Sequence, residues 1–240
     1  METISNKNDL RIFENFENIE AGFTRKPDTA DARRNLMVSS AEKSGGCVVK
    51  PILVHGNKVA AVTEGMLAGK SYIEITETDG LVTDIPNVVL TTTHADCIPL
   101  FAYDSHKKVI GIAHAGWKGT SKGIAYELAL AMINNYGCDA TNITAYIGPG
   151  ICKKYFEFGK DYAEECFVAK SDWMKNFIIS TAEDPDKVKI DLKGINERFF
   201  NLAGVTKVEI SSDCTYLDER YYSYRRAKDT ERMLAYIVLK

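Results

Sequence analysis

Short runs of apolar and β-branched residues, separated by polar turns, dominate the first half of the chain. Runs of this kind are typical of buried β-strands. They fall at residues 47–56, 58–63, 87–93, 98–104 and 108–116. The first two strands are expected to meet near residues 55–58. The first half is therefore predicted to be mainly β-structure.

The hydrophobic period changes in the middle of the chain. Ile124, Leu128 and Met132 recur at the spacing of one helix face, so a helix is predicted over residues 123–137. The same spacing predicts a second helix over 192–204. Its apolar face is expected to consist of Ile195, Phe199 and Leu202.

Strand runs return in the second half, at 142–148, 187–192, 207–213 and 232–240. Strands mixed with helices along one chain are typical of a layered α/β or α+β fold. Since no repeat or long linker interrupts the pattern, a single domain is expected over residues 1–240. The least patterned stretch, 26–46, is predicted to be a mobile surface loop.

Composition and charge limit the classes of molecule that the protein is expected to bind. The 240 residues are 45% hydrophobic and 26% charged, an ordinary globular balance, with a formal net charge of -3. Lysine and arginine are scattered, so no basic surface for nucleic acid or for an anionic membrane is predicted. A small-molecule partner is expected instead.

Targeting and cysteine patterns point to the cytoplasm. Residues 1–23 lack the basic start and apolar core of a signal peptide. No run of about 18 apolar residues, the length needed to cross a membrane, occurs anywhere. The six cysteines lie far apart without a C-x-x-C pair. Neither a disulfide framework nor a zinc ribbon is therefore predicted.

Three residues with coordinating side chains stand at the ends of predicted strands: His55, Cys97 and His114. A buried polar group without a partner costs roughly 1–3 kcal/mol, so these residues are expected to share a use. Two imidazoles and one thiolate form the ligand set of a catalytic zinc, which keeps a fourth position for water or substrate. The sequence predicts an open zinc site with these three residues as ligands and catalytic residues.

Other uses of the same residues stay open. Cys97 could act as a nucleophile with His114 as its base, as in a cysteine hydrolase. His94 or Asp96 could supply a fourth ligand and close the site as a non-catalytic structural zinc. Copper in a phenol oxidase is a further alternative, although four histidines are few for several copper sites.

Six short motifs connect these residues with a known family. They are "VHG" at 54–56, "DGLVT" at 79–83, "HADCIPLF" at 94–101, "AHAGWKGT" at 113–120, "IGPGICKKYFEFG" at 147–159 and "SYRR" at 223–226. With these motifs the chain resembles the multicopper polyphenol oxidoreductase or laccase-like family, now understood as purine nucleoside phosphorylases. The resemblance extends from Gly22 to Arg226.

This resemblance implies a zinc ion held by His55, Cys97 and His114. It implies phosphorolysis of adenosine, inosine and methylthioadenosine, with adenosine deamination as a further activity. It also implies a four-layer fold similar to the catalytic domains of cysteine-hydrolase toxins. The chain departs from the family at Leu53, where Gln is usual, and at residues 26–33, which replace a Gly-Gly-x-Ser stretch.

Phosphorolysis requires a bound phosphate and a proton donor. The forked guanidinium of arginine suits phosphate, and lysine supplies a point charge. Deamination requires an acid or base, for which Asp79, Asp96 and His94 are the candidates, and Asp96 is also expected to orient a ligand through a hydrogen bond. The residues expected to bind substrate are Arg25, Asp79, Lys118, Arg225 and Arg226.

Overall fold

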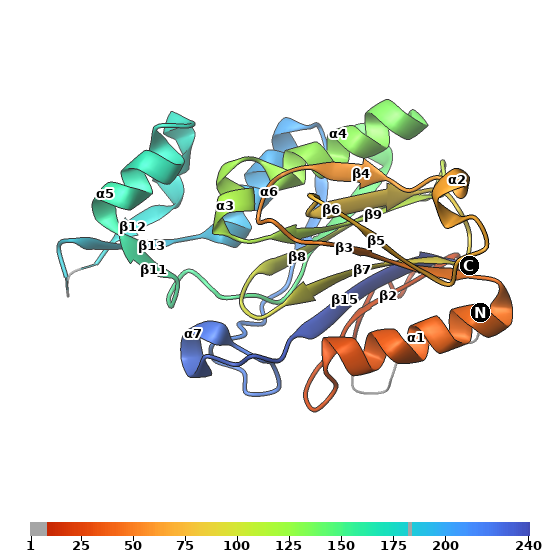
Figure 1. Ribbon diagram of the computed structural model, residues 1–240. Helices are drawn as coiled ribbons and strands as arrows, with labels where there is room; N and C mark the ends of the chain where they lie inside the picture. The colour runs from red at the N-terminus through yellow and green to blue at the C-terminus, as the bar shows by residue number, and fades with distance from the viewer. Residues whose placement is uncertain (1–8, 182–183) are drawn as a thin grey trace.

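Four layers of secondary structure are stacked in the order helix, sheet, sheet, helix, as Figure 1 shows for this computed structural model. The structure describes residues 9–181 and 184–240. Residues 1–8 begin the stretch in which no signal peptide is expected, and they lie outside the described residues. The expectation of a layered α/β fold with four layers is confirmed.

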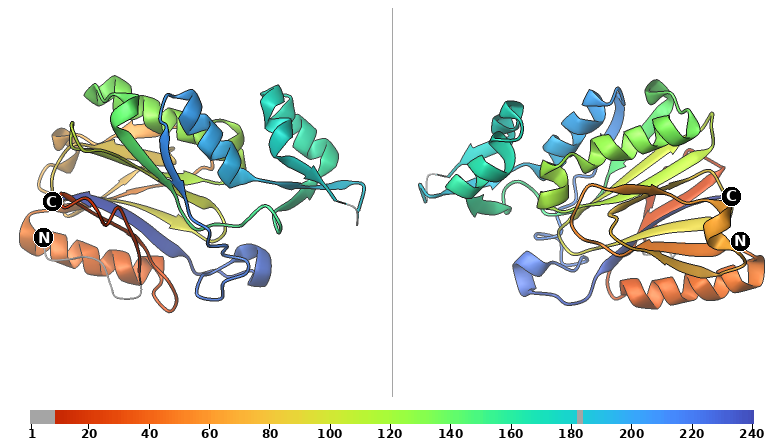
Figure 2. Two further views of the ribbon diagram at one scale, coloured as in Figure 1. Left: turned by 180° about the vertical axis from the view of Figure 1, so that it is seen from behind. Right: turned by 45° about the horizontal axis from the view of Figure 1, so that its top comes forward.

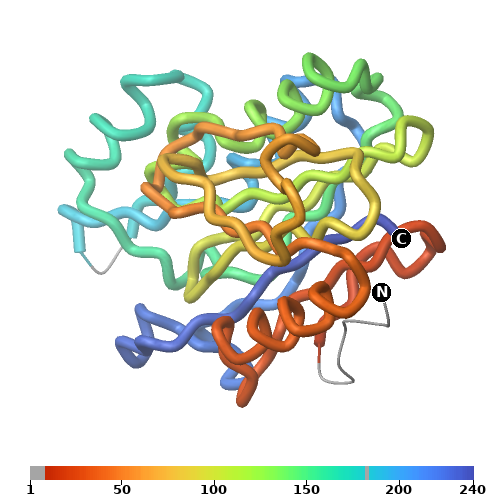
Figure 3. The backbone as a smooth tube through the Cα atoms, turned by 45° about the vertical axis from the view of Figure 1, so that its right-hand side comes forward, coloured from red at the N-terminus to blue at the C-terminus, as the bar shows by residue number. Residues whose placement is uncertain are grey.

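The first sheet combines strands from both ends of the chain. In spatial order it consists of β1 (Leu10–Ile12), β2 (Ile19–Phe23), β15 (Met233–Leu239), β7 (Val88–His94), β3 (Cys47–Pro51) and β5 (Tyr72–Ile75). β15 pairs antiparallel with both of its neighbours. Helix α1 (Ala30–Ser44) covers the outer face of this sheet, where Figure 3 shows it running along the bottom of the molecule.

Three of the six sequence motifs, those at 79–83, 94–101 and 113–120, lie in or beside strands of the second sheet. In spatial order it consists of β14 (Lys207–Ile210), β10 (Ile143–Ile147), β8 (Ile98–Asp104), β9 (Val109–Ala115), β6 (Gly80–Thr83) and β4 (Val59–Ala61). β8 and β9 pair antiparallel, with Pro99 opposite His114. Helices α4 (Ile124–Tyr136) and α6 (Leu192–Leu202) cover the outer face, as the right-hand view of Figure 2 shows.

Apolar cores fill the three spaces between the four layers, because successive side chains of a strand point to opposite faces. In β7, Val89 packs towards α1, whereas the neighbouring Leu90 packs between the two sheets. In β8, Leu100 packs towards α4, whereas Phe101 packs between the sheets. Each large sheet is therefore covered on both faces, which explains the continuous apolar runs in the sequence.

A third sheet stands beside the layers, at the left of Figure 1, and consists of β11 (Glu157–Gly159), β13 (Lys187–Ile190) and β12 (Ile178–Ser180). The remaining elements are short: α2 (Glu64–Leu67), α3 (Trp117–Ser121), α5 (Lys160–Ala163), α7 (Tyr224–Ala227), η1 (Ala140–Asn142), η2 (Glu164–Val168) and η3 (Asp172–Phe177). In the described part of the chain, no helix has both the length and the apolar composition required to span a bilayer. That the whole chain forms a single domain stays a prediction.

Residues 26–46 are not the mobile loop that the sequence predicts, since most of them form α1. Thr29 caps its first turn with its side-chain oxygen. The helix is hard to recognise because its buried face includes Arg33 and Arg34 instead of only apolar side chains. The guanidinium of Arg33 lies 2.7 Å from the carboxylate of Asp9, which makes its burial possible.

Two other local predictions also need correction. The strand expected over 47–56 ends at Pro51, because the chain leaves the first sheet there to reach β4 in the second. His55 therefore lies in a loop. In α6, Leu202 is the last residue and is 47% exposed, whereas Phe200 is fully buried in its place.

Leu90→Ala should lower the free energy of unfolding by about 2–5 kcal/mol, because Leu90 is fully buried and its removal leaves a cavity between the sheets. Leu36→Ala is the matched control, since Leu36 on α1 is 68% exposed. Its effect should stay within about 0.5 kcal/mol. Chemical denaturation followed by circular dichroism measures both, and equal losses would contradict this placement of the core.

Candidate metal centre

Three coordinating side chains meet at one end of the two large sheets. His55 lies in the loop between β3 and β4, Cys97 directly precedes β8, and His114 lies in β9. The pairing of Ile98 with Ala115 brings Cys97 beside His114. The ligand atoms of the three residues all lie within 4.8 Å of one another. The structure thus brings the three expected ligands together.

The group is open to solvent on one side. His55 is exposed and Cys97 half-buried, whereas His114 is buried. Within residues 9–181 and 184–240, no other set of three or more His, Cys, Asp or Glu side chains has ligand atoms as close. Three protein ligands with one accessible face are the arrangement of a catalytic metal site rather than a structural one.

A glycine leaves the space in which the three side chains meet. A Cβ atom on Gly116 would lie 3.1 Å from His55 Cδ2, 3.2 Å from Cys97 Sγ and 3.5 Å from His114 Cε1. Any side chain at this position would enter the space between the ligand atoms. A Cβ in the "HAGW" turn at this position would therefore crowd the group.

The buried carboxylate of Asp79 contacts two of the three residues. Its Oδ1 accepts a hydrogen bond from His55 N (2.9 Å) and lies 3.2 Å from His114 Nδ1. Its Oδ2 accepts hydrogen bonds from Val54 N (3.2 Å) and Gly56 N (2.7 Å). The sequence predicts that Asp79 binds substrate, but the carboxylate faces the protein, and a substrate contact would require these bonds to break.

The charges of Cys97 and His114 shift the pKa of each other and so determine the protonation of the group. Burial alone would raise the pKa of the Cys97 thiol, but the charges and hydrogen bonds of His114 and His55 lower it to about 6. Burial alone would lower the pKa of His114, but the charge of Cys97 and the hydrogen bond with Asp79 raise it to about 9. Without a metal, Cys97 is therefore a thiolate and His114 an imidazolium at pH 7.

His94 does not complete the group, although it stands close to it in the sequence. Its Nε2 lies 2.8 Å from Thr92 Oγ1, and its Nδ1 lies 3.1 Å from the carbonyl oxygen of Cys97. Burial and the charge of His114 hold the pKa of His94 well below its usual value. His94 is thus a neutral residue whose two ring nitrogens already have protein partners.

The carboxylate of Asp96 binds two segments that are distant from it in the sequence, and it is not part of the group of His55, Cys97 and His114. Its Oδ1 accepts a hydrogen bond from Thr215 Oγ1 (2.7 Å), and its Oδ2 accepts one from Arg225 N (2.6 Å). Asp96 has a φ of 87°, a conformation that is uncommon for residues other than glycine. These contacts fix the backbone directly before Cys97. Neither His94 nor Asp96 belongs to the group, so a closed structural zinc gains no support from the described residues.

The guanidinium of Arg226 is occupied by backbone carbonyl groups. Its Nη1 donates to the carbonyl oxygens of Thr215 (2.8 Å) and Tyr216 (3.0 Å), and its Nη2 donates to that of Tyr221 (2.7 Å). Arg226 therefore holds the loop 215–221 together. In this arrangement it is not free to bind phosphate as the sequence predicts.

The guanidinium of Arg225 has protein hydrogen-bond partners at only one of its nitrogens among the described residues. Its Nη1 donates to the carbonyl oxygens of Tyr155 and Glu157, both at 3.2 Å, and its guanidinium stands 5.3 Å from the ring centroid of Phe156. Among the described residues, no hydrogen-bond partner is seen for its Nε or Nη2. This part of the fork is available to an anion.

The two other expected cations differ in their surroundings. Arg25 Nε donates to Tyr221 Oη (3.1 Å), and Arg25 Nη2 lies 3.8 Å from the Asp213 carboxylate, which offsets its charge. Lys118 in α3 is exposed and lies 5.4 Å from the ring centroid of Trp117. Lys118, which follows His114 closely in the sequence, is therefore the more available of the two cations.

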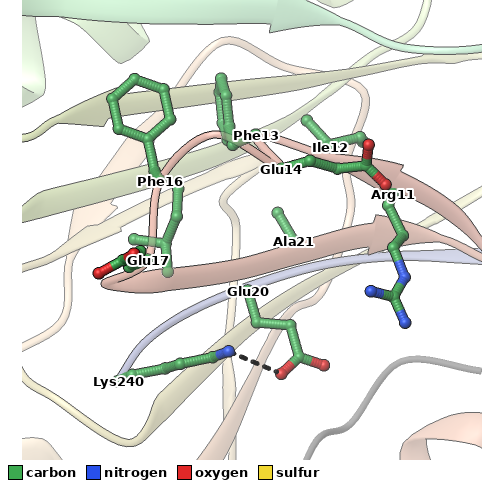
Figure 4. A pocket seen from close by; sticks show the side chains of 10 residues that line it. Arg11, Ile12, Phe13, Glu14, Phe16, Glu17, Glu20, Ala21 and Lys240 are labelled. Carbon is green, nitrogen blue, oxygen red and sulfur yellow. Dashed lines mark ion pairs between the residues drawn. The ribbon is translucent and has the colours of Figure 1, made fainter.

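A cavity of about 340 Å³ lies elsewhere, over the hairpin of β1 and β2 (Figure 4). Phe13 and Phe16 line it together with acidic residues, and Lys240 pairs with Glu20 across it at 3.6 Å. Lys240 follows the far end of β15, whereas the near end of that strand pairs with His94. The cavity therefore lies away from the group of His55, Cys97 and His114.

Comparison with known proteins identifies the family. Residues 12–240 match the multi-copper polyphenol oxidoreductase laccase family, and the chain belongs to it. The chain is 39% identical over 165 residues to a purine nucleoside phosphorylase of Deinococcus radiodurans, a match that covers 68% of this chain and 62% of that protein. It is 34% identical over 196 residues to the purine nucleoside phosphorylase YlmD of Bacillus subtilis, covering 78% and 68%. The chain thus spans less than two thirds of the Deinococcus relative.

Solved structures share the fold over almost the whole chain. The hypothetical protein YfiH of Bacillus licheniformis superposes with a TM-score of 0.82 at 27% identity, covering 99% of this chain and 98% of that one. YlmD of Geobacillus stearothermophilus superposes with a TM-score of 0.79 at 24% identity, covering 98% and 97%. The fold is therefore shared with these solved structures.

Gly116→Ala should weaken the binding of zinc, used as a probe of the group, by about 10-fold or more. The added methyl group would crowd His55 and Cys97, and overpacking a tight site costs about 1–3 kcal/mol. Gly65→Ala is the control, because a Cβ at Gly65 meets no atom within 4 Å. Titration against a chromogenic chelator measures both affinities. Wild-type zinc affinity in Gly116→Ala would contradict this role of the glycine.

In metal-free protein, alkylation of Cys97 by iodoacetamide should rise with pH with a midpoint near 6, because the reactive thiolate forms above its pKa. Cys138 is the internal control, since burial raises its pKa to about 12. Mass spectrometry of peptides from protein treated between pH 4 and 9 separates the two. A midpoint for Cys97 near 8.5, the value of an ordinary thiol, would contradict the thiolate–imidazolium pair.

Proposed function

We propose that the protein is a zinc-dependent purine nucleoside phosphorylase acting on adenosine, inosine and methylthioadenosine, with adenosine deamination as a second activity. The observation that carries this function is the open group of His55, Cys97 and His114. The names of the curated relatives support the same reaction class.

The donor set fits zinc better than copper. Two imidazoles and a thiolate suit this metal, and a thiol whose pKa is lowered to about 6 supplies the thiolate at neutral pH. Gly116 leaves the space between the ligand atoms. When bound, zinc would supply Lewis acidity and a water of lowered pKa. The four histidines of the chain are few for several copper ions.

Phosphorolysis further requires cations that hold phosphate near the anomeric carbon of the nucleoside. The exposed ammonium of Lys118 and the available part of the Arg225 fork suit this task. Asp96 accepts a hydrogen bond from Arg225 N and directly precedes Cys97. This contact connects the backbone of the proposed phosphate ligand with the segment that carries one proposed metal ligand.

A cysteine hydrolase is the second candidate, and one observation favours it. The Cys97 thiolate stands beside protonated His114, whose Nδ1 faces Asp79, which is the arrangement of a nucleophile, its base and an orienting carboxylate. In such a mechanism His55 would only support the thiolate through a hydrogen bond, whereas in the zinc site it is a ligand. The names of the relatives also favour the phosphorylase.

Zinc-loaded protein incubated with inosine should release hypoxanthine only when phosphate is present, because phosphate is the attacking group. Adenosine should give adenine in the presence of phosphate, and it should give inosine by deamination with or without phosphate. One chromatogram with and one without phosphate separates the two reactions. Base release that does not depend on phosphate would point to a hydrolase and would contradict phosphorolysis.

Two controls separate the zinc enzyme from the cysteine hydrolase. Cys97→Ala should lose both zinc and activity, since the thiolate is the softest of the three donors. His55→Ala should also lose both, but it leaves Cys97 and His114 in place. Activity retained by His55→Ala after zinc has been removed would favour the hydrolase.

A further inference from the structure

We infer that Asp79 is the positioning residue of the metal centre, because its one carboxylate holds two of the three ligands, His55 through the backbone and His114 through the ring. This inference rests on the proposed metal site, but it does not depend on which reaction the site performs. Its basis is the set of contacts around a carboxylate that is 0% exposed.

The first contact region is the loop that carries His55. Three successive backbone N–H groups, of Val54, His55 and Gly56, point at the two oxygens of Asp79. Successive N–H groups converge in this way when the backbone makes a concave anion-binding turn. His55 itself has a φ of 58°, in the left-handed region that non-glycine residues rarely adopt. The carboxylate therefore stabilises the unusual backbone from which the His55 ring projects.

The second contact region is His114. Its Nδ1 lies 3.2 Å from Asp79 Oδ1, so the Nδ1 proton is held there and Nε2 is left for the metal. The backbone N–H of His114 also donates to the carbonyl oxygen of Asp79, at 2.7 Å. Residue 79 thus fixes both the backbone and the ring of this ligand.

The position of Asp79 in the fold explains why it reaches both ligands. It directly precedes β6, and β6 pairs with β4 on one side and with β9 on the other. β4 follows the His55 loop, and β9 carries His114. Cys97, in contrast, is placed by its position before β8. Asp79 thus contacts both histidines, whereas Cys97 is placed by its own strand.

The test compares Asp79→Asn with the wild type in zinc affinity and in the absorption spectrum of the cobalt-substituted protein. In asparagine one oxygen is replaced by an NH2 group, which faces N–H donors and cannot accept their hydrogen bonds. Zinc affinity at pH 7.5 should fall about 10–100-fold, the usual effect of removing a partner of a metal-bound histidine. The ligand-field bands of bound Co²⁺ should change, which a purely structural role would not cause.

Asp104→Asn is the matched control. Asp104 is also 0% exposed, its Oδ1 accepts hydrogen bonds from the backbone N–H groups of His106 and Lys107, and it lies at the opposite end of β8 from Cys97. This substitution should lower stability without changing the zinc affinity or the cobalt spectrum. Wild-type zinc affinity together with a wild-type cobalt spectrum in Asp79→Asn would overturn the inference.

A measurement on the wild type covers the case in which Asp79→Asn does not fold. Nitrogen-15 NMR of the zinc-loaded protein should show that His114 binds zinc through Nε2 and retains the Nδ1 proton. Coordination through Nδ1 would overturn the inference, because Asp79 could not then hold that nitrogen. Wild-type protein that binds zinc through Nε2 of His114 but turns over no nucleoside would contradict the proposed function while supporting the positioning role.

Discussion

The antiparallel pairing of β8 with β9 is the contact on which the site depends. It brings Cys97 and His114 together at one end of the hairpin. Both strands are buried along their whole length, with α4 on one face and the first sheet on the other. A shift of one strand by a single residue would turn its apolar side chains to the wrong core. Core packing therefore places the strands of two candidate ligands, whereas His55 lies in a loop and depends on Asp79, which also holds the His114 ring.

The parts of the fold that the sequence predicts are those in which one physical rule dominates. Buried strands and the helix α4 follow from apolar periodicity, because their neighbours in space are also apolar. The helix α1 escapes this rule, since Arg33 is buried with acidic partners that lie elsewhere in the chain. The N-cap residue Thr29 is the local sequence signal that marks the start of this helix. The end of β3 at Pro51 depends on the crossing to the second sheet, which no local pattern records.

In the site, too, some features follow from local sequence and others depend on residues that are distant in the chain. Residue type alone makes His55, Cys97 and His114 candidate ligands, because few residue types bind zinc, although the strand end expected at His55 is a loop. The tasks of charged residues are less predictable, since one side chain suits several partners. Asp79 faces backbone N–H groups and a ligand, and Arg226 faces carbonyl oxygens, although both residue types also suit a substrate. Only the spatial arrangement of the loops distinguishes these tasks.

The protonation of the group bears on the choice between its two possible chemistries. Without a metal, Cys97 and His114 form a thiolate–imidazolium pair, which suits a nucleophile. A zinc ion bound by both residues would displace the proton from His114 Nε2 and engage the sulfur, so the nucleophile and the metal site exclude each other in one molecule. His55 is brought to the same point by an unusual backbone conformation and three hydrogen bonds to its loop. Without a metal His55 only supports the thiolate through a hydrogen bond, whereas a metal site uses all three side chains as ligands, and this feature favours zinc.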